Sequence, residues 1–207
     1  MGNHGRSLAI ASLRKIFEPN KNYHDYVSDS VGGMTIYNYG RSDTGYYGRS
    51  EVANTITQVP DLLTVFLGTN DWGLVPNPLG KFLDTETETI SGCINKCLLG
   101  LINKFYSKRI AVFTPLPRKD NWGSNAPANS KNNYTLEQLA EMIKRYADHY
   151  SIPCLDLYHE SNLSVYTPDG NKYYFTHPGG QDPDGVHPND AGHLVMAAKI
   201  RKFLEAI

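Results

Sequence analysis

The chain has 207 residues, of which 40% are hydrophobic, and its formal net charge at pH 7 is −1. A chain of this length can bury a full core, and we expect one domain over residues 1–207. The near-neutral charge excludes an electrostatic attraction to nucleic acid or to an anionic membrane surface. No apolar run reaches the roughly 18 residues that a membrane-spanning helix needs.

Strands and helices alternate along the sequence. Hydrophobic periodicity predicts helices over residues 8–17, 51–59, 85–106, 134–150 and 190–207, and strands over 34–37, 62–67, 109–114 and 152–157. Residues 72–84, 118–133 and 161–183 are predicted loops. The apolar run from Leu62 to Leu67 is typical of a strand that is buried on both faces of a parallel sheet. The alternation therefore predicts an α/β fold.

Polar residues follow several of the predicted strands. In parallel α/β sheets, ligands bind beside the carboxyl ends of the strands. Gly40, Asn70 and the loop after Pro115 stand at such ends. We expect their polar groups to converge at one edge of the sheet.

An acid and a histidine stand three residues apart near the C-terminus. Residues 182–190 read Asp-Pro-Asp-Gly-Val-His-Pro-Asn-Asp. Asp184 could hold the imidazole of His187 in one tautomer, and His187 could then act as a general base toward a nucleophile from elsewhere. On local sequence alone, a turn that caps the last helix, with Asn189 or Asp190 as the cap, explains the same residues.

Three blocks together resemble the SGNH (GDSL-type) hydrolase family. They are Asn38-Tyr39-Gly40 after a predicted strand, Gly68-Thr69-Asn70-Asp71 after the next strand, and Asp184 to Pro188 before the last helix. They occur in the family's order and span most of the chain. The resemblance implies a three-layer, flavodoxin-like sandwich with a parallel sheet, and a serine hydrolase of esters or acyl groups that needs no cofactor.

The resemblance also assigns roles to residues. His187 is similar to the family's general base and Asp184 to its orienting acid. The side chain of Asn70 and the backbone N–H of Gly40 match the oxyanion-hole donors. Ser7, in Gly5-Arg6-Ser7-Leu8, stands where the family has its nucleophile, and its intervals to Gly40 and Asn70 are similar to the family's.

The nucleophile block differs from the family's in two respects. Arg6 replaces an acid, and the few residues before Ser7 cannot form the family's first strand, which we therefore expect to be missing from the chain as given. The tripeptide Gly-Arg-Ser also recurs at 40–42 and 48–50. These departures leave Ser7 as a candidate nucleophile only.

Other residues have simpler interpretations. His193 lies in the last predicted helix and is interpreted as a surface or packing residue. The remaining histidines lack metal-ligand spacing, so we expect no metal site. Cys93 and Cys97 are interpreted as packing residues of a helix, and the three cysteines form no disulfide framework. Trp72, Trp122 and the aromatic residues of 166–175 line an acyl or sugar pocket, or cover the core.

Three hypotheses of function follow. The first is a serine esterase or acylhydrolase acting on a small-molecule or carbohydrate ester. The second is a catalytically silent relative that binds a glycan or a protein partner. The third is a fragment whose exposed sheet pairs with a second copy of the chain. Neither the acyl group, nor the alcohol, nor the cellular location follows from the residues.

Overall fold

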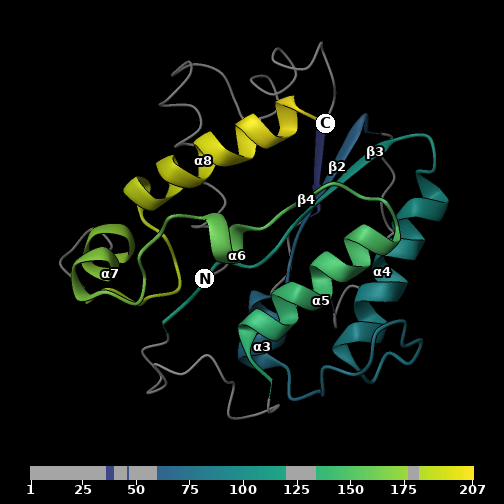
Figure 1. Ribbon diagram of the computed structural model, residues 1–207, viewed down its shortest axis with the longest axis horizontal. Coiled ribbons are helices and arrows are strands. Elements are labelled where there is room, and N and C mark those ends of the chain that lie inside the picture. The colour runs from purple at the N-terminus through teal and green to yellow at the C-terminus, as the bar shows by residue number, and fades with distance from the viewer. Residues whose placement is uncertain (1–35, 40–45, 47–59, 120–133, 177–181) are drawn as a thin grey trace. The chain divides into compact units, whose positions relative to one another are not determined.

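The computed structural model describes residues 36–39, 46, 60–119, 134–176 and 182–207 (Figure 1). These residues fall into two compact units. The sheet unit takes the described residues of Ile36–Pro115 and Pro127–Tyr158, and the C-terminal unit takes those of Leu116–Ala126 and His159–Ile207. The expectation of a single domain over residues 1–207 is not tested by this division and stays a prediction.

The sheet unit contains a parallel sheet of four strands. They are β1 (Ile36–Tyr39), β2 (Leu62–Phe66), β3 (Arg109–Phe113) and β4 (Cys154–Leu155), and they lie side by side in chain order. In the register, Tyr37 lies opposite Leu63 and Leu63 opposite Ile110. Leu62, Leu63 and Val65 of β2 are at most 1% exposed, as expected for a strand covered on both faces. The predicted α/β class with a parallel sheet is confirmed.

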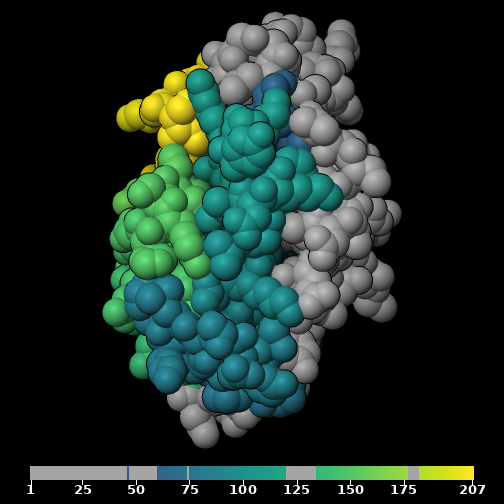
Figure 2. All heavy atoms as spheres, turned by 90° about the vertical axis from the view of Figure 1, so that its right-hand side faces the viewer, coloured from purple at the N-terminus to yellow at the C-terminus, as the bar shows by residue number. Residues whose placement is uncertain are grey.

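One face of the sheet is covered by α4 (Ile90–Lys104) and α5 (Leu136–His149), which pack against each other. Because the strands follow one another in chain order and parallel crossovers are right-handed, both crossover helices must lie on the same face. Figure 1 shows them side by side there. Figure 2 looks onto the outer surface of this layer, where α4 and the segment before it face the viewer. Such packing buries most of each helix's apolar side.

The apolar spacing of α5 explains how it packs. Leu136, Leu139, Ile143 and Tyr146 recur at helical intervals and are at most 1% exposed. The helix begins after Thr135, whose side chain accepts the Gln138 N–H, while the Gln138 side chain accepts the Thr135 N–H. This reciprocal pair is a capping box. The predicted helix 134–150 is therefore confirmed, with its start fixed by Thr135.

Two short helices lie in segments that the sequence predicted as loops. α3 (Thr69–Leu74) begins directly after β2, and α7 (Pro168–Phe175) lies inside the predicted loop 161–183. Thr167 caps α7 by accepting the Gly170 N–H, and Pro168 occupies its first turn. Both are start signals for a helix. The apolar pattern of this segment was too short to predict α7, since only Asn171 and Phe175 of the helix are buried.

The C-terminal unit is built from α7 and α8 (Asp190–Glu205), which pack against each other. The short helix α6 (Leu157–Glu160) spans the division between the two units. The predicted closing helix is confirmed as α8, with Asn189 as its cap. None of the helices in the described part of the chain has the length and apolar character that crossing a bilayer requires.

Candidate active site

Asp184 and His187 form a side-chain pair in the turn before α8. The Nδ1 atom of His187 lies 2.7 Å from Oδ2 of Asp184. The other carboxylate oxygen, Oδ1, accepts the backbone N–H groups of Val186 and His187, each at 2.8 Å. The pairing predicted from the three-residue spacing is therefore present. The turn before the last helix, which also explained these residues, is present too. The Asp184 carboxylate accepts hydrogen bonds from the backbone of the turn and from the His187 ring.

The ionisation of this pair follows from its hydrogen bonds. Burial alone would raise the pKa of Asp184, but the hydrogen bonds from the side chain and backbone of His187 and from the backbone of Val186 outweigh it and lower the pKa below its ordinary value of 3.8. Asp184 is thus a carboxylate at neutral pH and can only accept hydrogen bonds. A neutral His187 must then carry its proton on Nδ1, which leaves Nε2 able to accept a proton.

Gly185 shapes the backbone between the acid and the histidine. Its φ of +65° lies in the left-handed region that favours glycine. A Cβ at this position would come within 1.9 Å of the backbone oxygen of Lys119. The Lys119 N–H donates to the Gly185 carbonyl at 2.7 Å. The turn is therefore fixed against the segment that follows β3, and it tolerates no side chain there.

In the sheet unit, Asn70 stands in the first turn of α3, directly beyond the carboxyl end of β2. Gly68 makes this connection with a φ of +117°, and a Cβ there would lie 3.2 Å from both Ile143 and Pro115. The neighbouring Asp71 is fully buried and accepts the Tyr46 N–H at 2.8 Å. Asp71 thus bonds loop backbone and holds the segment that carries Asn70.

A polar cluster that the sequence did not predict lies at the same edge of the sheet. Asp156 directly follows β4, and its Oδ1 accepts the hydroxyl of Thr114, which directly follows β3, at 3.1 Å. Its Oδ2 lies 2.8 Å from Nζ of Lys144, which also lies 3.0 Å from Glu141. The signal was available, since each of Thr114 and Asp156 is a polar residue immediately after a strand.

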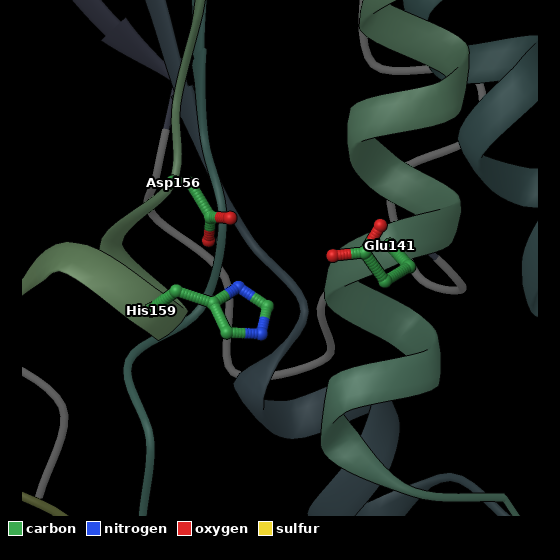
Figure 3. A group of neighbouring side chains, drawn as sticks. All are labelled: Glu141, Asp156 and His159. Carbon is green, nitrogen blue, oxygen red and sulfur yellow. The ribbon is translucent and has the colours of Figure 1, made fainter.

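Glu141, Asp156 and His159 each place a potential ligand atom within 4.8 Å of the others (Figure 3). Exposed clusters of this kind are common without a metal. The ammonium group of Lys144 already forms ion pairs with both carboxylates. Hydrogen bonds to Asp156 and Glu141 raise the pKa of Lys144, which keeps it charged. We interpret the cluster as an ion-pair network, and the expectation of no metal site stays a prediction.

The remaining candidates divide into three groups. Ser7, Gly40 and Trp122 lie outside the described residues, so their roles stay predictions. Asn70 and the Asp184–His187 pair belong to different units, and their meeting also stays a prediction. Trp72 and His193 are 2% and 5% exposed, so both are packing residues.

Two of the tyrosines of 166–175 are largely exposed. Tyr166 and Tyr173 are 52% and 65% exposed. Tyr173 and Tyr174 are neighbours in α7 and pack edge to face, with ring centroids 4.9 Å apart. Of the two interpretations from the sequence, the cover over the core therefore fails for Tyr166 and Tyr173, and the pocket stays a prediction.

The chain matches a known family of proteins. Residues 11–195 match the model of the GDSL-like lipase/acylhydrolase family, so the matched range includes Gly40, Asn70, Asp184 and His187 and begins after Ser7. No curated protein sequence matches the chain.

Several solved structures share the fold. A protein of Lactobacillus plantarum is 25% identical, with a TM-score of 0.65, and the alignment covers 76% of this chain and 72% of that one. A possible lipase from Chitinophaga pinensis DSM 2588 is 20% identical, with a TM-score of 0.65 and coverage of 95% and 93%. A carbohydrate esterase family 3 protein from Talaromyces cellulolyticus is 19% identical, with a TM-score of 0.51 and coverage of 81% and 72%. The last two similarities show the fold alone.

Proposed function

Because the chain belongs to the GDSL-like lipase/acylhydrolase family, we propose that it is a serine hydrolase that cleaves ester or acyl groups with His187 as general base. The observation that carries the proposal is the 2.7 Å contact between His187 Nδ1 and Asp184 Oδ2. It leaves Nε2 as the basic atom of an imidazole whose tautomer is fixed. A carboxylate in this position also stabilises the imidazolium that forms when the base takes a proton.

In the proposed reaction, Ser7 Oγ attacks the carbonyl carbon of the substrate while His187 Nε2 takes the hydroxyl proton. The tetrahedral intermediate collapses, the C–O bond to the leaving alcohol breaks, and His187 returns the proton to that alcohol. A water molecule then attacks the acyl-serine by the same route and releases the acid. Asp184 stays ionised throughout.

Gly40 and Asn70 are the proposed donors to the oxyanion. Asn70 has support from its place just beyond the carboxyl end of a buried parallel strand, where ligands of such sheets bind. Donors aimed at the developing charge lower the barrier, and losing one typically costs on the order of 10²- to 10³-fold in turnover. Replacing Asn70 by Ala should therefore lower kcat more than it raises KM.

The decisive experiment measures turnover of p-nitrophenyl acetate and labelling by a fluorophosphonate. The wild type should hydrolyse the ester and gain one adduct, which peptide mapping should place on Ser7. His187→Ala should lower kcat on the order of 10⁶-fold and abolish labelling, because the serine then lacks its base. Ser7→Ala should do the same.

Ser50→Ala is the matched control, because Ser50 ends the same Gly-Arg-Ser tripeptide as Ser7. It should keep wild-type turnover and labelling. An adduct on another serine would overturn the role of Ser7 and keep that of His187. A folded wild type with neither turnover nor adduct would overturn the proposal and favour the silent relative.

A further inference from the structure

We infer that Asn189 is a positioning residue for His187, because its side-chain amide fastens the turn that carries His187 to the last turn of α7. The inference rests on the proposed function of His187 as the general base. Asn189 appeared in the sequence only as a possible cap of the last helix. The structure gives its side chain a second set of contacts, on a different helix.

The amide of Asn189 uses its full hydrogen-bonding capacity. Its Oδ1 accepts the N–H groups of Ala191 and Gly192 at 3.0 and 3.2 Å, which caps α8. Its Nδ2 donates to the carbonyl oxygens of Tyr173 and Thr176 at 2.8 and 2.9 Å. An asparagine side chain has two N–H donors and one carbonyl acceptor with two lone pairs, and all are used. The residue thus joins the end of α7 to the start of α8.

The backbone of Asn189 strengthens this link, since its N–H donates to the Tyr174 carbonyl at 2.7 Å. The carbonyls in the last turn of a helix have no partner within the helix. Asn189 donates to three carbonyls at the end of α7, those of Tyr173, Tyr174 and Thr176. The end of α7 and the turn before α8 are therefore held as one piece.

His187 depends on this piece for its orientation. Its side chain is 69% exposed, so packing does little to hold the ring. Only Pro188 separates it from Asn189, and the ring of proline restricts φ at that position. A shift at Asn189 therefore moves His187 directly. On the other side, the turn is fixed by the contact of Gly185 with Lys119.

Two substitutions separate the link to α7 from the cap of α8. Serine and aspartate are as good as asparagine at a helix N-cap, so Asn189→Ser and Asn189→Asp preserve that role. An aspartate side chain cannot donate to the carbonyls of Tyr173 and Thr176, and a serine hydroxyl has one donor on a shorter side chain. The serine variant also adds no charge beside His187, which controls for the charge of the aspartate variant.

The test compares these variants with the wild type in p-nitrophenyl acetate turnover and fluorophosphonate labelling. Both variants should lower kcat roughly 10- to 100-fold, the range expected when a catalytic group is misplaced by about 1 Å. KM should stay within about twofold, because no substrate contact is removed. The labelling rate should fall in the same proportion as kcat. The Nδ1–H proton resonance of His187 should broaden in both variants, which a purely structural role would not require.

Thr167→Ala is the control for a helix cap in the same unit. The substitution removes the Thr167 hydroxyl, which caps α7 by accepting the Gly170 N–H. It changes no hydrogen bond of Asn189 or His187. It should lower the thermal midpoint and leave kcat of the folded protein unchanged. Comparable kcat losses in this control would overturn the inference, because any loosening of the unit would then explain them.

With an active wild type, unchanged kcat and labelling rate in both Asn189 variants would overturn the inference alone. If Asn189→Ser does not fold, Asn189→Asp decides, because its carboxylate keeps the cap. Absence of turnover and labelling in the wild type would overturn the proposed function of His187, and the positioning role with it.

Discussion

The carboxylate of Asp184 accepts three hydrogen bonds from Val186 and His187, the two residues at the end of its own turn. Two of them, from the backbone of Val186 and His187, would form in any tight turn of this kind. The third, from the His187 ring, is the only one that bears on catalysis. A substitution that keeps the first two and changes the third can therefore separate the fold of the turn from its chemistry.

Asp184→Asn is that substitution. Its amide oxygen can still accept the two backbone N–H groups, while its NH₂ group faces His187 Nδ1 and donates to it. The ring must then carry its proton on Nε2, the atom that has to act as base. We expect kcat to fall on the order of 10⁴-fold, as when a triad aspartate is replaced by asparagine, with little change in the thermal midpoint. Steady-state kinetics and calorimetry measure the two effects.

Asp182→Asn is the control, since Asp182 is an exposed acid two residues earlier in the same segment. It should leave both quantities unchanged. If Asp184→Asn instead unfolds the protein while retaining the activity of the folded fraction, the carboxylate is a turn residue and not an orienting acid.

The pairing of Asp184 with His187 was predictable because it is local. The two residues are three positions apart, and Gly185 between them allows the turn. The contacts of Asn189 with Tyr173 and Thr176 were not predictable, because α7 itself was predicted as a loop. Thr114 and Asp156 bond to each other at the ends of two strands. The sequence shows that each is a polar residue after a strand, but not that these two residues meet. Local geometry was thus available from the sequence, and contacts between elements were not.

At the scale of elements, the helix α5 shows how a cap and an apolar face act together. Its capping box satisfies two N–H groups that would otherwise lack partners at the first turn. Its buried face then packs on the sheet unit, where each fully buried leucine or isoleucine contributes roughly 1.5 to 3 kcal/mol. The packing contributes most of the stability, and the cap determines where the helix begins.

Thr135→Ala should lower the free energy of unfolding by about 1 kcal/mol, since an alanine cannot accept the Gln138 N–H. Gln138→Ala should cost less, because Gln138 is exposed and only the reverse half of the box is lost. Urea denaturation of both single variants and the double variant gives the coupling between them. Strictly additive effects would show that the two halves of the box act independently.

The elements that the sequence predicted well are those with long periodic patterns. β2, β3, α5 and α8 all appear within a few residues of their predicted bounds. β4 is shorter than predicted, because only Cys154 and Leu155 join the ladder. α4 begins later than residue 85, because the hydroxyl of Thr89 accepts the Gly92 N–H and starts the helix there. Side-chain caps, more than apolar spacing, decide these boundaries.

At the scale of the molecule, the sheet unit excludes water from several acidic groups that are neutral at physiological pH. Burial raises the pKa of the Cys93 thiol from 9.0 to about 11, and the charges of Asp71 and Glu88 add to the effect. Burial raises the pKa of Cys154 to about 12, and those of Tyr46 and Tyr134 are raised as well. Such groups make the stability of the fold depend on pH in the alkaline range.

The sign of that dependence follows from proton binding. In the unfolded chain a cysteine releases its proton near pH 9, while the folded chain holds the proton of Cys93 until about pH 11. The contribution of the protonated Cys93 thiol to the stability of the fold is therefore complete below pH 9 and is lost as pH rises toward 11. The unfolding free energy should fall by at most about 1.4 kcal/mol per pH unit for each such group. The tyrosines add to the loss only from about pH 10.

Cys93→Ala should therefore change the slope of this pH dependence as well as the stability at pH 7. Its unfolding free energy should fall less steeply than that of the wild type above pH 9, because one of the titrating groups is gone. Urea denaturation in the presence of a reducing agent, at several pH values from 7 upward, measures both curves. A constant offset between them at every pH would mean that Cys93 ionises equally easily in the folded and unfolded chains, which a thiol with 0% exposure in the core should not do.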